Sequence, residues 1–89
     1  MKQVWKYIIQ FNHTTSISMP VGATILMVAN QRNVPCLWAL VDPEADTEVR
    51  QFRIAGTGHD IEAGHAENYV GSILAMDEGL VLHIFEIAP

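Results

Sequence analysis

The stretch "TILMVANQRNVPCLWALVD", residues 24–42, decides the fold. Two apolar runs, 24–31 and 34–42, flank the short polar turn "QRN", which is typical of a β-hairpin with a bulge-prone connection. Both faces of each run are apolar, whereas a strand with one face in water alternates apolar and polar residues. We therefore expect both faces of this hairpin to be buried, one by the core of the domain and the other by a second subunit.

Similar segments extend in both directions along the chain. Residues 3–11, 49–55, 69–76 and 80–87 are rich in β-branched and aromatic residues and predict further strands, the last two joined around Asp77, Glu78 and Gly79. Residues 16–23 predict a short extended piece ending in a turn, 43–48 an acidic turn, and 60–68 at most one helical turn. The sequence thus predicts one all-β domain over 1–89, with about six antiparallel strands in a small sheet, barrel or sandwich.

The composition favours self-association. Hydrophobic residues make up 49% of the 89 residues and charged residues 17%. A chain of this size buries only about 60–65% of the surface that its unfolded form exposes. We expect a homo-oligomer, a dimer or a tetramer. The net charge of −5 argues against duplex nucleic acid or an anionic membrane as the main partner, and no segment approaches the roughly 20 apolar residues of a membrane span.

The loop "RIAGTGHDI", residues 53–61, is the candidate binding site. Small residues around Thr57 allow backbone N–H groups to converge on an anion, with Arg53, His59 and Asp60 close in sequence. A tight turn explains the glycines as well, and the dinucleotide motif GxGxxG is incomplete because Ile61 stands where its third glycine belongs. The spacing of the glycines alone favours a tight turn, whereas the polar side chains nearby in sequence favour a bound ligand.

Other residues suggest binding more than catalysis. The aromatic side chains that could stack on a base are Trp5, Tyr7 and Trp38, although packing is the default role of each.

His59 and His65, with Glu62 between them, match no common zinc spacing. Ser18 and Ser72 lack a nucleophile elbow, and Asp42 and Glu44 lie on an acidic turn. His83 fits a hydrogen-bonded, half-buried histidine, and Cys36 a small buried hydrophobe. We expect no metal, no cofactor and no enzymatic activity.

Five segments in order resemble a family of small bacteriophage-encoded proteins of unassigned function: "WKY" at 5–7, "MPVGA" at 19–23, "LWALVD" at 37–42, "FRIAGTGHDI" at 52–61 and "LHIFE" at 82–86. The likeness extends to viral sponges of the anti-CBASS type, which are compact oligomers that bind cyclic nucleotide messengers without cleaving them. It implies a cyclic dinucleotide ligand, the cytoplasm of an infected bacterial host, and phosphate or base contacts from Arg53, Thr57, Gly58 and His59. Residues 63–68 match no landmark, which leaves the role of His65 open.

Two other functions remain open at this point. An apolar or acidic surface could dock on a host enzyme and inhibit it without any small ligand. The chain could also be a small structural or assembly accessory protein. Depletion of a nucleotide from solution, and its intact release on heating, would distinguish a sponge from both.

Overall fold

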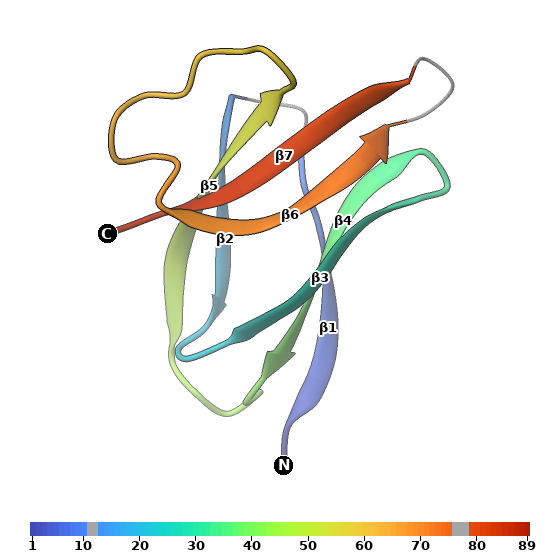
Figure 1. Ribbon diagram of the computed structural model, residues 1–89. Helices are drawn as coiled ribbons and strands as arrows, with labels where there is room; N and C mark the ends of the chain where they lie inside the picture. Colours follow the sequence, from blue (N-terminus) through green and yellow to red (C-terminus); the bar gives the residue numbers. More distant parts are fainter. Residues whose placement is uncertain (11–12, 76–78) are drawn as a thin grey trace.

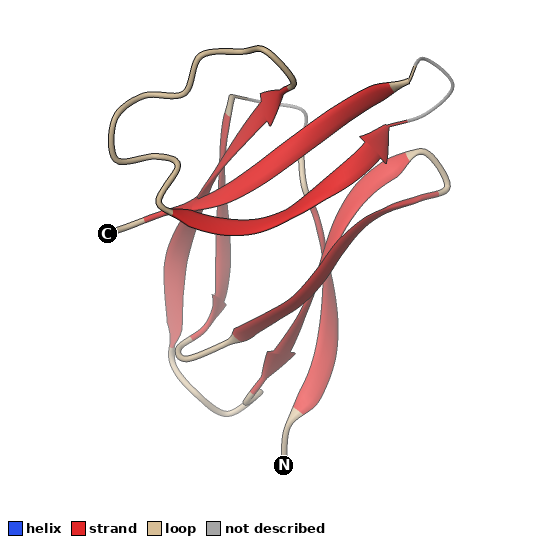
Figure 2. Ribbon diagram, in the orientation of Figure 1, coloured by secondary structure: helices blue, strands red, loops and turns tan. Residues whose placement is uncertain are grey.

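The computed structural model describes residues 1–10, 13–75 and 79–89, and within these ranges it contains strands and no helix (Figures 1 and 2). The strands are β1 (Gln3–Ile8), β2 (Thr14–Pro20), β3 (Thr24–Gln31), β4 (Val34–Val41), β5 (Thr47–Gly56), β6 (Asn68–Ala75) and β7 (Leu80–Ile87). The predicted all-β class is confirmed. The predicted strand ends at 11 and 76 and the turn residues 77 and 78 lie outside the described ranges. In those ranges no helix is long and apolar enough to cross a bilayer.

The strands form two antiparallel sheets. We call β1-β4-β3 the small sheet and β2-β5-β7-β6 the large sheet, each written in the order of hydrogen-bonded neighbours. The sheets pack face to face, and β3 lies next to β6 where they meet (Figure 1). In each sheet the face turned toward the other sheet is the inner face, and the opposite one is the outer face.

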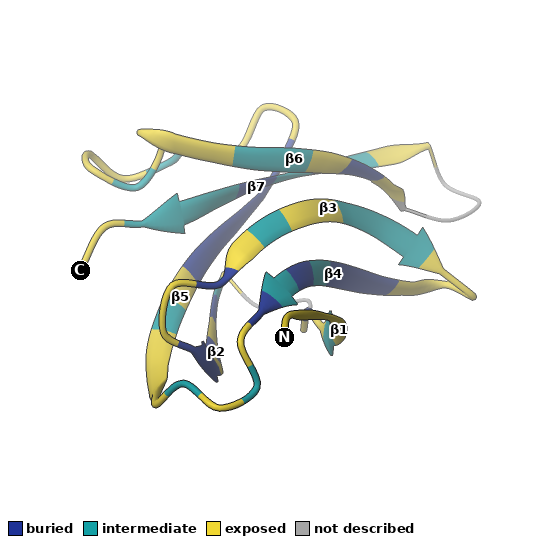
Figure 3. Ribbon diagram, turned by 90° about the horizontal axis from the view of Figure 1, so that it is seen from below, coloured by how far each residue is buried: buried dark blue, intermediate teal, exposed yellow. Residues whose placement is uncertain are grey.

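The core fills the space between the two inner faces. Leu37, Ala39 and Val41 of β4 are almost fully buried and belong to one core cluster with Phe52 of β5 and Ile84 of β7. Figure 3 shows the buried stretch of β4 in dark blue. Among the described residues, much of the outer face of the small sheet is exposed. Its apolar side chains include Val4, Ile8 and Met27, whose exposed fractions are 55%, 62% and 51%. The covering by a second subunit stays a prediction.

One strand more is present than the sequence predicted. The segment expected to be a short extended piece is β2, which pairs with β5 from Thr14 opposite Arg53 to Pro20 opposite Thr47. Buried Ile17 and Met19 alternate with exposed Ser16 and Ser18, as in a strand with one face in water. The proline is tolerated because it is the last residue of an edge strand, where no ladder bond is lost.

Two loops also differ in detail from their predictions. The β3–β4 connection is a tight turn at Arg32 and Asn33, whose φ values of 53° and 65° are those of a type I′ turn, and the bulge lies instead between Ile25 and Met27. Residues 60–68 contain no helical turn. They form a hydrogen-bonded turn in which the N–H of His65 donates to the carbonyl of Glu62.

A second bulge lies between Tyr69 and Gly71 of β6, the strand of the large sheet that lies next to β3. A Cβ atom placed on Gly71 would lie 2.6 Å from Cγ2 of Val28, so this backbone position has no room for a side chain. Glycine inside a strand is typical of such a bulge and of a close approach between elements.

We expect Gly71→Ala to lower the free energy of unfolding by about 1–3 kcal/mol, because the added methyl group overlaps the Val28 side chain. Chemical denaturation of the single variants and of the double variant Gly71→Ala/Val28→Ala measures this. In the Val28→Ala background the loss should be much smaller. An equal loss in both backgrounds would show that the contact with Val28 is not the cause.

Candidate functional site

Four polar side chains form a hydrogen-bonded row on the outer face of the large sheet. The hydroxyl of Tyr69 lies 2.6 Å from Oγ of Ser72, which lies 2.9 Å from Nδ1 of His83. Nε2 of His83 lies 2.9 Å from Oγ1 of Thr57, the first residue of the loop after β5. We call these residues the hydroxyl–imidazole row. Tyr69, Ser72 and Thr57 are exposed and His83 is half-buried, so a solute can reach the row.

The row depends on the bulge in β6. Residues three apart in a regular strand point to opposite faces, yet Tyr69 and Ser72 share one face because the bulge inserts an extra residue between them. The ladder then sets Tyr69 opposite Phe85 and Ser72 opposite His83. This arrangement was not predicted from the sequence. Gly71 within a strand was the signal that could have revealed it.

The row can carry its hydrogen bonds in either neutral form of the imidazole. If Nε2 holds the proton, His83 donates to Thr57 and accepts from Ser72, which accepts from Tyr69. If Nδ1 holds it, every direction reverses. A protonated His83 donates to both neighbours. The row can therefore adjust its donors and acceptors to a polar ligand without moving a heavy atom.

An aromatic surface borders the row. The rings of Tyr69 and Phe85 lie 5.5 Å apart in an edge-to-face arrangement, on neighbouring strands. Such rings offer apolar area with defined orientation, which suits a flat heterocycle. Hydroxyl donors, an imidazole and aromatic rings are thus available side by side.

The loop residues Thr57, Gly58 and His59 form a tight turn. The N–H of His59 donates to the carbonyl of Gly56, and Gly58 has a φ of +87°, as the third residue of a type II turn requires. Gly56 has no room for a side chain, since a Cβ atom there would lie 2.9 Å from Cε1 of His59. Nδ1 of His59 accepts the N–H of Gly56, which leaves Nε2 as a donor when the ring is neutral. The loop is a turn, and it also places Thr57 in the row.

Arg53 is placed differently from the expectation of a ligand contact. It is only 3% exposed, and its guanidinium donates to the carbonyls of His13, Ile54 and Asp60 and to the carboxylate of Glu62. These partners keep the cation occupied inside the chain. Arg53 therefore anchors the loop that follows β5, on the same face of the large sheet as the row.

Glu62 completes this anchor from the loop side. Its Oε1 lies 3.2 Å from Nε of Arg53 and its Oε2 lies 2.6 Å from Nε2 of His13. The hydrogen bond with His13, helped by a backbone hydrogen bond and by Arg53, lowers the pKa of Glu62 from 4.5 to about 2. His65 lies beside the same carboxylate, with Nδ1 3.5 Å from Oε2. Within the described part of the chain, no three potential metal ligands gather.

The three aromatic residues expected to stack on a base lie in the other sheet and do not share one face. The ladder pairs Lys6 with Trp38, so Trp38 is on the outer face of the small sheet, while Trp5 and Tyr7 are on the inner side of β1. Tyr7 packs against the core, and burial raises the pKa of its hydroxyl. The structure brings Thr57, Gly58 and His59 together and leaves Trp5, Tyr7 and Trp38 apart from them.

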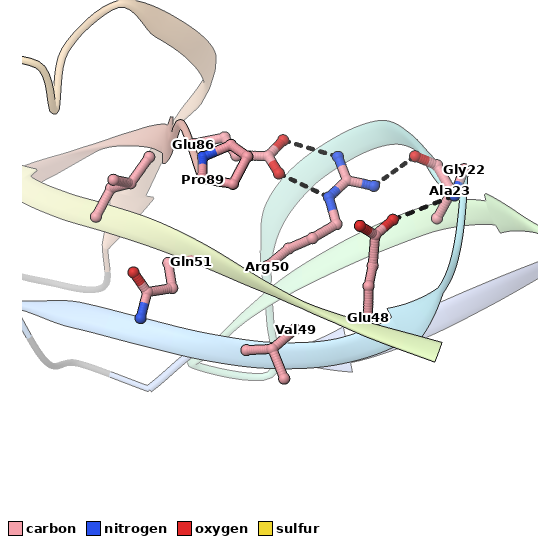
Figure 4. A pocket seen from close by; sticks show the side chains of 9 residues that line it. Gly22, Ala23, Glu48, Val49, Arg50, Gln51, Glu86 and Pro89 are labelled. Atoms are coloured by element: carbon pink, nitrogen blue, oxygen red, sulfur yellow. Dashed lines mark hydrogen bonds and ion pairs between the residues drawn. The ribbon is translucent and has the colours of Figure 1, made fainter. Parts of the chain in front are cut away.

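A separate hollow of about 570 Å³ lies at the end of the sandwich near Gly22 (Figure 4). Its cation, Arg50, binds Glu86 through two hydrogen bonds of 2.6 and 2.7 Å and donates to the carbonyl of Ala23. The hydrogen bond with Glu86 raises the pKa of Arg50. Because Glu48 also lines this hollow, it holds more carboxylates than cations and is a poor site for an anion.

A protein-family model described as "Domain of unknown function (DUF7352)" matches residues 1–89. No curated protein and no solved structure matches the chain. The geometry of the site itself must therefore indicate its chemistry.

We expect the interactions of Glu62 with Arg53 and His13 to make the free energy of unfolding depend on pH. The folded state holds the pKa of Glu62 near 2, below its ordinary 4.5, so its stabilisation is complete above about pH 4.5 and is lost as the pH falls toward 2. Glu62→Gln should be less stable than the parent at neutral pH, and this difference should shrink on acidification. Urea denaturation across this pH range measures it. Glu67→Gln is the control, and a parallel pH profile for both variants would contradict the assignment.

Proposed function

The chain belongs to the DUF7352 family, and we propose that it binds a small anionic nucleotide, a cyclic dinucleotide, and holds it intact. The binding site is the hydroxyl–imidazole row with the rings of Tyr69 and Phe85 beside it. Withholding the nucleotide from a host effector would make the protein an anti-defence sponge, as the resemblance to small bacteriophage proteins implies. The observation that carries the proposal is the row itself, drawn from three separate elements and open to solvent.

The chemistry of the row suits a nucleotide. Hydroxyl and imidazole donors hydrogen-bond phosphate and ribose oxygens, and a protonated His83 adds a positive charge where a phosphate would lie. The edge of the neighbouring aromatic pair offers apolar area for a base. Such a site needs no excess of lysine and arginine, which agrees with the net charge of −5.

The same geometry argues against cleavage. A serine hydrolase orients its histidine with a carboxylate and activates the serine from the other ring nitrogen. Here Thr57, a neutral hydroxyl, takes the place of the carboxylate, and Ser72 is held by Tyr69 as well as by His83. The row is therefore a set of fixed contacts rather than an activated nucleophile, and binding without turnover is its best-supported use.

We expect Thr57→Val and Ser72→Ala each to weaken binding of a cyclic dinucleotide by about threefold to tenfold, the value of one hydrogen bond. Calorimetric titration with a panel of cyclic dinucleotides measures the affinities. Ser18→Ala is the matched control, since Ser18 is an exposed hydroxyl on β2 of the same sheet, away from the row. Unchanged affinity in the folded row variants would place the ligand elsewhere.

Turnover is tested on the same samples. The protein is incubated with each nucleotide and then heated, and the released material is analysed by chromatography. Intact nucleotide supports the sponge, and a cleaved product would show an enzyme. If no nucleotide is depleted by the unmodified protein, the proposed function is wrong and inhibition through a protein partner becomes the better explanation.

A further inference from the structure

Strand β1 is an edge strand that nothing in the described chain covers. It is bonded to β4 on one side only, and five of its six residues are exposed (Figure 3). Its apolar side chains lie on both faces, with Val4 and Ile8 outward and Trp5 inward. Proteins protect such edges with several charges, prolines or bulges, because an open edge pairs with other strands. In β1 the single charged residue is Lys6.

The free edge has a defined set of backbone groups. The N–H of Ile9 donates to the carbonyl of Pro35, so odd-numbered positions bond to β4. Backbone bonding alternates from side to side along a strand. The N–H and carbonyl groups of Val4, Lys6 and Ile8 therefore point away from β4, toward a position that another strand can occupy.

Charge indicates which strand fits there. All ten Asp and Glu residues lie at position 42 or later, whereas residues 1–41 contain the cations Lys2, Lys6 and Arg32 and no carboxylate. Two copies of a protein with net charge −5 repel each other most where their acidic parts meet. The three strands of the small sheet contain no carboxylate, whereas Glu48 and Glu86 lie on strands of the large sheet, so contact through β1 joins strands without carboxylates.

We propose that β1 of a second copy pairs antiparallel with β1 across a two-fold axis, so that the two small sheets become one continuous sheet. In such a pair, each residue must lie opposite a residue of the same face. The register that places Trp5 opposite Trp5 of the other copy meets this condition, and it keeps the two Lys6 side chains from lying directly opposite each other. Val4 then faces Lys6 of the other copy, and each such pair exchanges both backbone hydrogen bonds. This interface is independent of the nucleotide site, which lies on the other sheet.

Disulfide trapping tests the register. Opposed residues of a non-hydrogen-bonded antiparallel pair have Cα atoms about 4.5 Å apart, within the range of a disulfide. In a Cys36→Ala background, Trp5→Cys should give a cross-linked dimer about tenfold faster than Val4→Cys, whose symmetry mate lies too far away. Faster cross-linking through position 4, or none at position 5, would overturn the register.

Light scattering tests the strand pairing itself. Lys6→Pro removes an N–H from the free edge and leaves the bonds to β4 in place. This variant should therefore be a monomer by light scattering and still be folded by circular dichroism. The parent and the Lys6→Thr control should remain dimers. A monomeric parent, or a dimeric Lys6→Pro, would overturn the proposal. If Lys6→Pro does not fold, the cross-linking result decides.

Discussion

A buried guanidinium must be surrounded by hydrogen-bond acceptors, and this requirement organises one end of the large sheet. Arg53 meets it with backbone carbonyls from β5, from the loop after β5 and from the segment before β2, together with one carboxylate. A buried cation left without such partners is strongly destabilising. The loop after β5 is consequently tied to the buried Arg53 at Asp60 and Glu62. Thr57, at the start of this loop, lies at hydrogen-bond distance from His83.

The sequence was informative where periodicity alone decides structure. The hairpin of β3 and β4 has nearly the predicted bounds, because long apolar runs around a polar turn permit few other folds. It was less informative at β2, where Pro20 and Gly22 suggested a turn although the preceding alternation was already that of a strand. Local pattern describes each strand, whereas the order of strands in a sheet depends on contacts distant in sequence.

In the candidate site too, local features could be predicted from the sequence and contacts between distant residues could not. Glycines around Thr57 correctly indicated a tight turn, and Thr57 does lie among polar groups. Arg53 could not be recognised as an anchor, since its partners come from residues up to 40 positions away. The sequence does not reveal that Ser72 and His83 act together, because only the bulge at Tyr69 and Gly71 and the pairing of β6 with β7 bring them together. The three aromatic residues lie apart from the loop at Thr57 because β1 and β4 belong to the small sheet, whereas the loop follows β5 of the large sheet.

The topology also imposes an order on folding. The hairpin of β3 and β4 lies, in sequence, between β2 and β5, which are partners in the other sheet. Its two-residue turn closes a short loop, and hairpins of this kind form within about 1–10 μs. Pairing of β2 with β5 must close a loop that already contains the hairpin, and such non-local pairing is slow. We expect pulse-labelling hydrogen exchange to find the amides of β3 and β4 protected first, so that the large sheet and its binding face are completed last.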